Sequence, residues 1–149
     1  MKVPILNLTR QYEGLRGEIE KAVCEQMASG MYIGGAAVEN FEQKFAKYIG
    51  VKHAIAVNSG TDALVIAMKA MGIGEGDEVI TTPFTFFATA ETIAMVGAKP
   101  VFCDVEEDTY NIDAGKIEAL ITPKTKAILP VGYLLMVPKP TSGTLVPTR

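Results

Sequence analysis

Three small residues at the start of one segment have the types and spacing to hold a phosphate. In the segment Ala54–Leu64, an apolar run ends at Asn58, and Ser59, Gly60 and Thr61 then precede a helix-forming stretch. The first N–H groups of a helix have no partner within it, and the helix dipole places partial positive charge there. Two hydroxyl groups beside such an N-terminus suit an oxyanion such as a phosphate. The simpler alternative is that Ser59 or Thr61 only caps the helix.

The glycine pattern excludes the two commonest nucleotide-binding sequences. No Gly-Lys-Ser/Thr follows Gly60, as a Walker A sequence would require, and G-x-G-x-x-G spacing is absent. The turn alone is therefore a weak indication of phosphate binding. Its place after a predicted strand strengthens the interpretation, because open α/β sheets bind ligands at the carboxyl ends of their strands.

A second group of candidate residues follows the short strand predicted at 78–81, which ends at Thr81-Thr82. Pro83 forces a turn there, and three aromatic residues come next, Phe84, Phe86 and Phe87. Their spacing alone predicts that they pack in the core. If a flat cofactor ring lies near the phosphate turn, one of them would instead stack on the face of that ring.

The remaining candidates favour structural roles. Asp104 ends another predicted strand and is expected to form a turn, and His53, the single histidine, is expected at the surface. Cys24 and Cys103 lack the spacing of metal-binding pairs. We therefore expect buried, reduced thiols in a reducing cytoplasm, and no metal site.

Apolar periodicity predicts the elements that must position these residues. Helices are expected at 11–29, 38–48, 62–71, 86–96 and 113–121, and strands at 54–57, 78–81, 100–104 and 127–131. Their alternation predicts an α/β fold with a mainly parallel sheet flanked by helices and preceded by N-terminal helices. Helices 62–71 and 86–96 are apolar almost all round, so both are expected to be buried.

Three stretches of different character are expected along the chain. Residues 1–50 form a helical segment, 51–131 an α/β domain, and 132–149 a divergent, poorly ordered tail. The 149 residues are 48% hydrophobic and 21% charged with a net charge of -3, which is ordinary for a soluble globular protein. Scattered basic residues argue against nucleic acid as a partner, and short apolar runs argue against a membrane. The N-terminus becomes polar too soon for a secretory signal.

Eight segments between Pro4 and Val131 match one enzyme family in sequence and order. They are Leu8–Tyr12, Tyr32–Gly35, Phe41–Glu42, Asn58–Leu64, Gly74–Ile80, Thr85–Thr89, Gly97–Phe102 and Thr125–Val131. Together they resemble the N-terminal portion of the DegT/StrS-type nucleotide-sugar aminotransferases, which are pyridoxal 5'-phosphate (PLP) enzymes of the aspartate aminotransferase fold, type I. The resemblance implies that residues 51–131 are part of a PLP-binding large domain.

The resemblance assigns roles to particular residues. It implies cofactor contacts at Ser59, Gly60, Thr61 and Phe86, and substrate contacts at Tyr32 and Gly34. Gly60 and Thr61 would donate hydrogen bonds to the cofactor phosphate while Ser59 shapes the turn, and Phe86 would stack on the pyridine ring. The loop 32–35 would lie near the entry for the sugar nucleotide, in a region shared across a dimer interface. An anion at a helix N-terminus and a flat ring against an aromatic face agree with these roles physically.

The sequence departs from the family after Val131. The family continues there with a His-Leu-aromatic-Gly segment, then with an aspartate that pairs with the ring nitrogen, and later with the Schiff-base lysine. Here Gly132–Met136 follows instead, and Lys124, Lys126 and Lys139 all lack the family's context. The resemblance therefore implies no catalytic residue in this chain, weak or absent cofactor binding, and a truncated or frame-shifted product.

The resemblance also implies an activity for the intact family. Its members transfer an amino group, usually from glutamate, to a keto-sugar nucleotide for polysaccharide or amino-sugar biosynthesis, and a cytoplasmic homodimer is expected. Three alternatives stay open. Some members replace the lysine with histidine and act as dehydratases. A non-catalytic remnant or interaction fragment would keep an exposed sheet edge that favours association. An unrelated phosphate-binding α/β domain would require the eight segments to match by coincidence.

Overall fold

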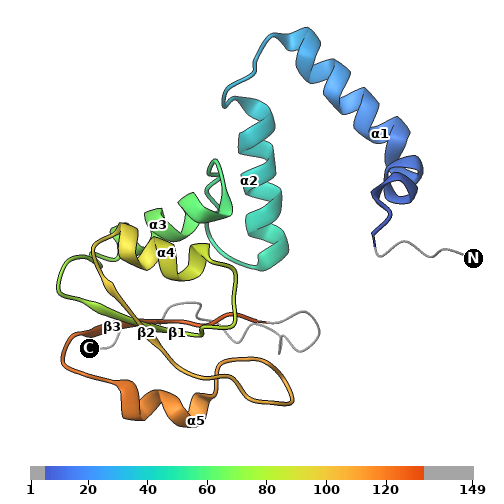
Figure 1. The fold of residues 1–149 in the computed structure, drawn as a ribbon. Coiled ribbons are helices and arrows are strands. Elements are labelled where there is room, and N and C mark those ends of the chain that lie inside the picture. Colours follow the sequence, from blue (N-terminus) through green and yellow to red (C-terminus); the bar gives the residue numbers. More distant parts are fainter. Residues whose placement is uncertain (1–5, 133–149) are drawn as a thin grey trace, which may run out of the picture. The chain divides into compact units, whose positions relative to one another are not determined.

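Residues 6–132 are described in the computed structural model of the chain, and they fall into two units that divide between Ala56 and Val57 (Figure 1). All of the predicted tail except Gly132 lies outside the described residues. No helix within 6–132 is long and apolar enough to cross a membrane.

The N-terminal unit consists of two helices, α1 (Leu8–Ser29) and α2 (Ala36–Ile49). Both begin a few residues before the predicted starts. The Asn7 side chain accepts a hydrogen bond from the Arg10 N–H at 3.1 Å and so caps α1. Gly30 ends α1 in the left-handed conformation, at φ 68°, which glycine adopts without steric cost.

The apolar stripe of α1 stays exposed in the described part of the chain. Its members are 40–60% exposed, namely Leu15, Ile19, Val23 and Met27. Cys24 is also exposed, so the prediction of a buried thiol is wrong at this position. The physical reason is that Cys24 lies on a helix of which no residue is buried in the described part of the chain.

The C-terminal unit is built on three parallel strands, β1 (Glu78–Thr81), β2 (Lys99–Phe102) and β3 (Thr125–Leu129), in the order β2-β1-β3. β1 is central, and all four of its residues are buried. Ile80 lies opposite Val101 on β2, and the register is regular along that pair. The α/β fold with a parallel sheet, predicted from the alternation of elements, is confirmed.

Helices lie on both faces of this sheet (Figure 1). Helices α3 (Gly60–Ala70) and α4 (Ala88–Met95) cover one face, and α5 (Ala114–Ile117), which continues into the 3-10 helix η1 (Glu118–Leu120), lies on the other. A short turn leads from α3 into β1 and from α4 into β2, so both helices run antiparallel to the strands. Both helices therefore begin at the edge where the strands end. We call this the carboxyl edge and the opposite one the amino edge.

The core lies between the sheet and the two helices above it. It comprises Met68, Ile73, Val79, Ile93, Ala98, Ala127 and Leu129. Met68 is the buried residue of α3, and Ile66 on the same helix is 51% exposed. Helix α4 buries Ile93 completely but leaves Met95 60% exposed. The prediction that both helices are buried is therefore correct only for the side of each that faces the sheet, and their other apolar residues stay exposed.

One predicted strand, at 54–57, does not form. A strand needs a neighbour for its N–H and C=O groups, and none of the three described strands pairs with this segment. The Ala56 N–H instead donates to the Glu42 carboxylate at 2.7 Å. The predicted helix at 113–121 is present as two pieces, α5 and η1.

Candidate cofactor site

Ser59 fixes the start of α3. Its backbone is extended, and its side-chain oxygen accepts a hydrogen bond from the Asp62 N–H at 3.0 Å. Its carbonyl accepts from the Ala63 N–H, also at 3.0 Å. Ser59 therefore caps the helix, as the simpler alternative predicts, and its hydroxyl is already engaged with the helix.

The next two N–H groups are available to a ligand. Within the described chain, neither Gly60 nor Thr61 donates its N–H to any acceptor. A methyl group added at Gly60 would meet no atom within 4 Å, so the space above this turn is open. The dipole of an eleven-residue helix adds partial positive charge here, whereas the Asp62 carboxylate in the first turn opposes an anion. Two free donors in open space fit a phosphate group.

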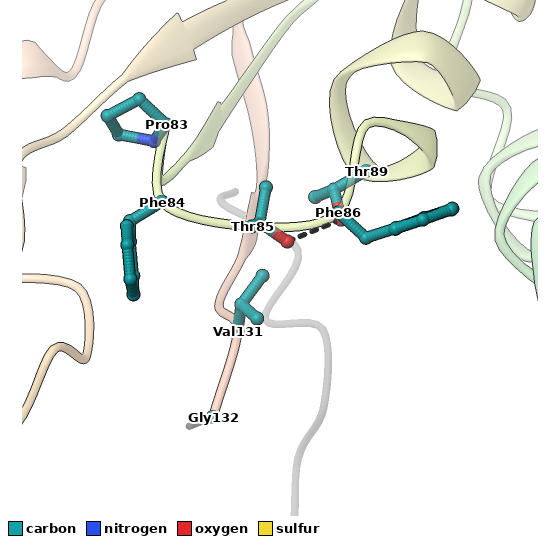
Figure 2. A pocket seen from close by; sticks show the side chains of 7 residues that line it. All are labelled: Pro83, Phe84, Thr85, Phe86, Thr89, Val131 and Gly132. Carbon is teal, nitrogen blue, oxygen red and sulfur yellow. Dashed lines mark hydrogen bonds between the residues drawn. The ribbon is translucent and has the colours of Figure 1, made fainter. Parts of the chain in front are cut away.

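The predicted aromatic group lies in the loop between β1 and α4. Phe84, Phe86 and Phe87 are 43%, 79% and 74% exposed, so the prediction that they pack in the core is wrong. The loop follows the end of β1 and so lies at the carboxyl edge. In Figure 2 the Phe84 and Phe86 rings leave this loop in different directions. The Phe86 ring, at 79% exposure, can contact a ligand.

A pocket of about 710 Å³ opens at the same edge (Figure 2). It is lined by the β1–α4 loop and the residues after β3, namely Pro83, Phe84, Thr85, Phe86, Thr89, Val131 and Gly132. Its volume is in the range of small-molecule sites, and its position matches the general rule for open parallel sheets. The Phe84 ring also contacts Tyr110, with 5.5 Å between ring centres. The mostly apolar lining suits a flat organic ring.

Sequence reasoning did not single out two residues of this pocket. The hydroxyl oxygens of Thr85 and Thr89 lie 2.9 Å apart, one on each side of Phe86 in sequence. The signal available in the sequence was the spacing of two threonines four residues apart at a predicted helix start. That spacing is common on helices and does not by itself distinguish a functional pair.

The two predicted substrate residues belong to the N-terminal unit. Tyr32 is 73% exposed, and its hydroxyl donates to the Met27 carbonyl at 3.0 Å, which fastens the loop to the end of α1. Gly34 has a φ of +64°, a left-handed conformation that favours glycine. Gly60, Thr61 and Phe86 belong to the other unit, where α3 and α4 both begin at the carboxyl edge.

Other reactive side chains on the C-terminal unit are engaged in structure. Cys103 is buried as predicted; burial, followed by the Asp113 charge, raises the pKa of its thiol. Asp104 accepts from the Val105 N–H at 2.9 Å and pairs with Lys116 at 3.7 Å, whereas the turn in this loop lies at 107–109. Lys116 pairs with Asp113 at 3.2 Å, which raises the pKa of the lysine. No cluster of three or more metal-ligating side chains occurs among residues 6–132.

Comparison with curated proteins finds relatives that match most of this chain. The chain is 52% identical over 131 residues to a pleiotropic regulatory protein of Geobacillus stearothermophilus, covering 88% of this chain and 35% of that protein. It is 44% identical to a UDP-2-acetamido-2-deoxy-3-oxo-D-glucuronate aminotransferase of Pseudomonas aeruginosa, covering 87% and 36%. The chain thus spans about a third of the length of these curated relatives.

Solved structures show the same relationship. The S. venezuelae DesV structure superposes with a TM-score of 0.84 at 43% identity, over 87% of this chain and 35% of that one. NtdA from Bacillus subtilis, with bound cofactor PMP, superposes with a TM-score of 0.82 at 37% identity, over 87% and 30%. The sequence model of one protein family matches residues 14–134 of this chain. The chain belongs to the DegT/DnrJ/EryC1/StrS aminotransferase family.

Proposed function

We propose that this chain forms the cofactor-binding part of a PLP-dependent aminotransferase that acts on a keto-sugar nucleotide. Glutamate is the proposed amino donor, and polysaccharide or amino-sugar biosynthesis the proposed setting. The observation that carries the proposal is the start of α3, where the Gly60 and Thr61 N–H groups lack an acceptor within the described residues. The exposed Phe86 ring is on the same edge of the sheet.

Each proposed residue has one physical task. PLP, when bound, supplies the electron sink that transamination requires. The N–H groups of Gly60 and Thr61 hold its phosphate, and Ser59 keeps them aligned by capping the helix. Phe86 lies against one face of the ring and shields that face from water. In the other unit, Tyr32 and the left-handed Gly34 shape a loop that contacts the sugar nucleotide.

A cytoplasmic homodimer is the proposed assembly. The exposed apolar stripe of α1 supports association, because a row of apolar side chains in water is unfavourable until it is covered. Sedimentation of the purified chain would measure the assembly directly.

A titration of the 149-residue chain with PLP tests the proposed phosphate contact. Gly60→Pro removes the N–H, yet proline is well tolerated at the first position of a helix, and the extended backbone of Ser59 suits a following proline. We expect Gly60→Pro to weaken PLP binding about tenfold or more, because a hydrogen bond to a charged group is lost.

Gly60→Ala is the matched control. It keeps the N–H and adds a methyl group to open space, so its affinity should stay near that of the wild type. Pyridoxal, which lacks the phosphate, should bind the wild type and Gly60→Pro equally. Equal PLP affinity in Gly60→Pro and Gly60→Ala would refute the proposed phosphate site.

A further inference from the structure

Two threonine side chains from the loop segment around Phe86 are hydrogen-bonded to each other. Thr85 Oγ1 and Thr89 Oγ1 lie 2.9 Å apart, and the dashed line in Figure 2 joins them beside Phe86. The two ends of the pair differ in surroundings: Thr89 is 8% exposed within the first turn of α4, whereas Thr85 is half-buried in the loop. The hydrogen bond therefore ties the loop to a fixed point on the helix.

That fixed point is itself anchored in the core. The Thr92 side chain is fully buried, and its hydroxyl donates to the Thr89 carbonyl at 3.2 Å. The Thr89 N–H in turn donates to the Phe86 carbonyl at 3.0 Å. A chain of hydrogen bonds thus runs from the core through Thr89 to the Phe86 backbone and to the Thr85 side chain. The backbone of Phe86 is held while its ring remains in solvent.

The hydroxyl pair does not act as an ordinary helix cap. A capping side chain accepts a hydrogen bond from an N–H in the first turn, and the residue at the N-cap position of α4, Phe87, makes no such bond. Thr85 instead bonds to another side chain, so the bond does not satisfy a helix N–H. What it restrains is the loop that carries Phe86. With 79% of Phe86 exposed, packing against the described chain contributes little to its orientation.

We propose that Thr85 and Thr89 are positioning residues that set the Phe86 ring against the face of a planar, PLP-like cofactor. The inference rests on the proposed function, because it takes the ligand of Phe86 to be the pyridine ring. A stacked aromatic contact needs a defined ring position, and a loop without this brace would have to order the ring at the moment of binding.

Paired substitutions separate the hydroxyl from the shape of the side chain. Thr85→Val and Thr89→Val keep the volume and remove the hydrogen bond, whereas Thr85→Ser and Thr89→Ser keep a hydroxyl. Thr109→Val is the control: this threonine is also half-buried, and its hydroxyl bonds to Glu106 at 2.8 Å in a different loop. The readouts are PLP affinity, the circular dichroism of bound PLP, and hydrogen exchange of the Phe86–Thr89 amides without cofactor.

We expect the valine variants to weaken PLP binding about threefold to tenfold, close to the effect of losing the aromatic contact itself. They should also alter the dichroism of the bound cofactor and speed amide exchange at Phe86–Thr89, while the serine variants and Thr109→Val resemble the wild type. In a Phe86→Ala background, Thr89→Val should add no further loss of affinity, because the ring that it positions is gone.

The outcomes distinguish this inference from the proposed function. The positioning role alone would be overturned if the valine variants kept wild-type amide exchange, PLP affinity and dichroism while Phe86→Ala weakened PLP binding. An equal loss of affinity for Thr89→Val with and without Phe86 would also overturn it, since the effect would then be general. If the wild-type chain shows no PLP binding, both the proposed function and this inference fail.

Discussion

The two edges of the sheet differ in whether their polar groups have hydrogen-bond partners within the described chain. At the amino edge the Glu78 side chain is 12% exposed, accepts a hydrogen bond from the Thr122 hydroxyl at 2.6 Å and pairs with Lys99 at 3.6 Å. Its N–H donates to the Lys124 carbonyl at 2.8 Å. The side chain and backbone of Glu78 thereby link the starts of all three strands. The polar groups of Glu78 find their partners within the protein.

At the carboxyl edge, two backbone N–H groups lack an acceptor among the described residues and an aromatic ring is exposed. The Gly60 and Thr61 N–H groups have no acceptor within 6–132, and Phe86 exposes most of its ring. Open donors and exposed aromatic rings contribute little to folding, but they are the groups that a ligand can use. The contrast supports a stabilising role for the amino edge and the proposed binding role for the carboxyl edge.

The largest expected effect comes from the core that both edges share. Ile93 is fully buried between α4 and the sheet. Ile93→Ala should lower the free energy of unfolding by about 2–5 kcal/mol, because it leaves a cavity in the core. Urea denaturation followed by far-UV circular dichroism measures this. A loss below about 1 kcal/mol would contradict the packing described for α4.

Phe86→Ala should separate binding from stability. The ring is 79% exposed, so the melting temperature should hardly change. PLP binding should weaken roughly two- to tenfold, which corresponds to about 0.5–1.5 kcal/mol for a lost aromatic stack. Fluorescence titration and a thermal melt of the same sample provide both values. A large drop in melting temperature with unchanged affinity would reverse the roles assigned to the two edges.

A smaller, acid-dependent effect is expected at the amino edge. The hydrogen bond from Thr122 lowers the pKa of Glu78, with Lys99 and Lys124 acting in the same sense and burial opposing them. Because the folded-state pKa is below its ordinary value, the stabilisation is complete above that ordinary value. It is lost as the pH falls through the lowered one.

Glu78→Gln tests this directly through melting temperatures measured across a pH series. The variant should be less stable than the wild type by a few degrees at neutral pH, and the difference should shrink in acid. PLP affinity should stay unchanged, since this side chain is at the opposite edge. A gap that is constant with pH would show that the carboxylate charge plays no part.

The local sequence pattern was enough to predict those elements whose structure is determined by residues close to them in sequence. The strand at 78–81 was predicted at its observed bounds, and the small polar residues before α3 do mark the start of that helix. The strand was predicted from its short β-branched run, and the helix start from the small polar residues that precede it. The parallel sheet followed because helices separate successive strands.

The features that could not be predicted depend on what covers a surface. The segment 54–57 has the composition of a strand, yet no described strand pairs with it. Phe86 and Cys24 have the types of buried residues, yet both are exposed. An apolar side chain signals that burial is favourable, but it does not specify a partner. The hydroxyl pair of Thr85 and Thr89 was missed because it depends on the course of a loop.

Backbone amide chemical shifts of the isotope-labelled chain, recorded while PLP is added, test the central claim most directly. We predict that the largest shift changes fall on Gly60 and Thr61, that inorganic phosphate reproduces them in part, and that residues of the β1–α4 loop respond to PLP alone. Changes centred on Lys99 and Lys124 at the amino edge, or no change at Gly60 and Thr61 under saturating PLP, would contradict the account.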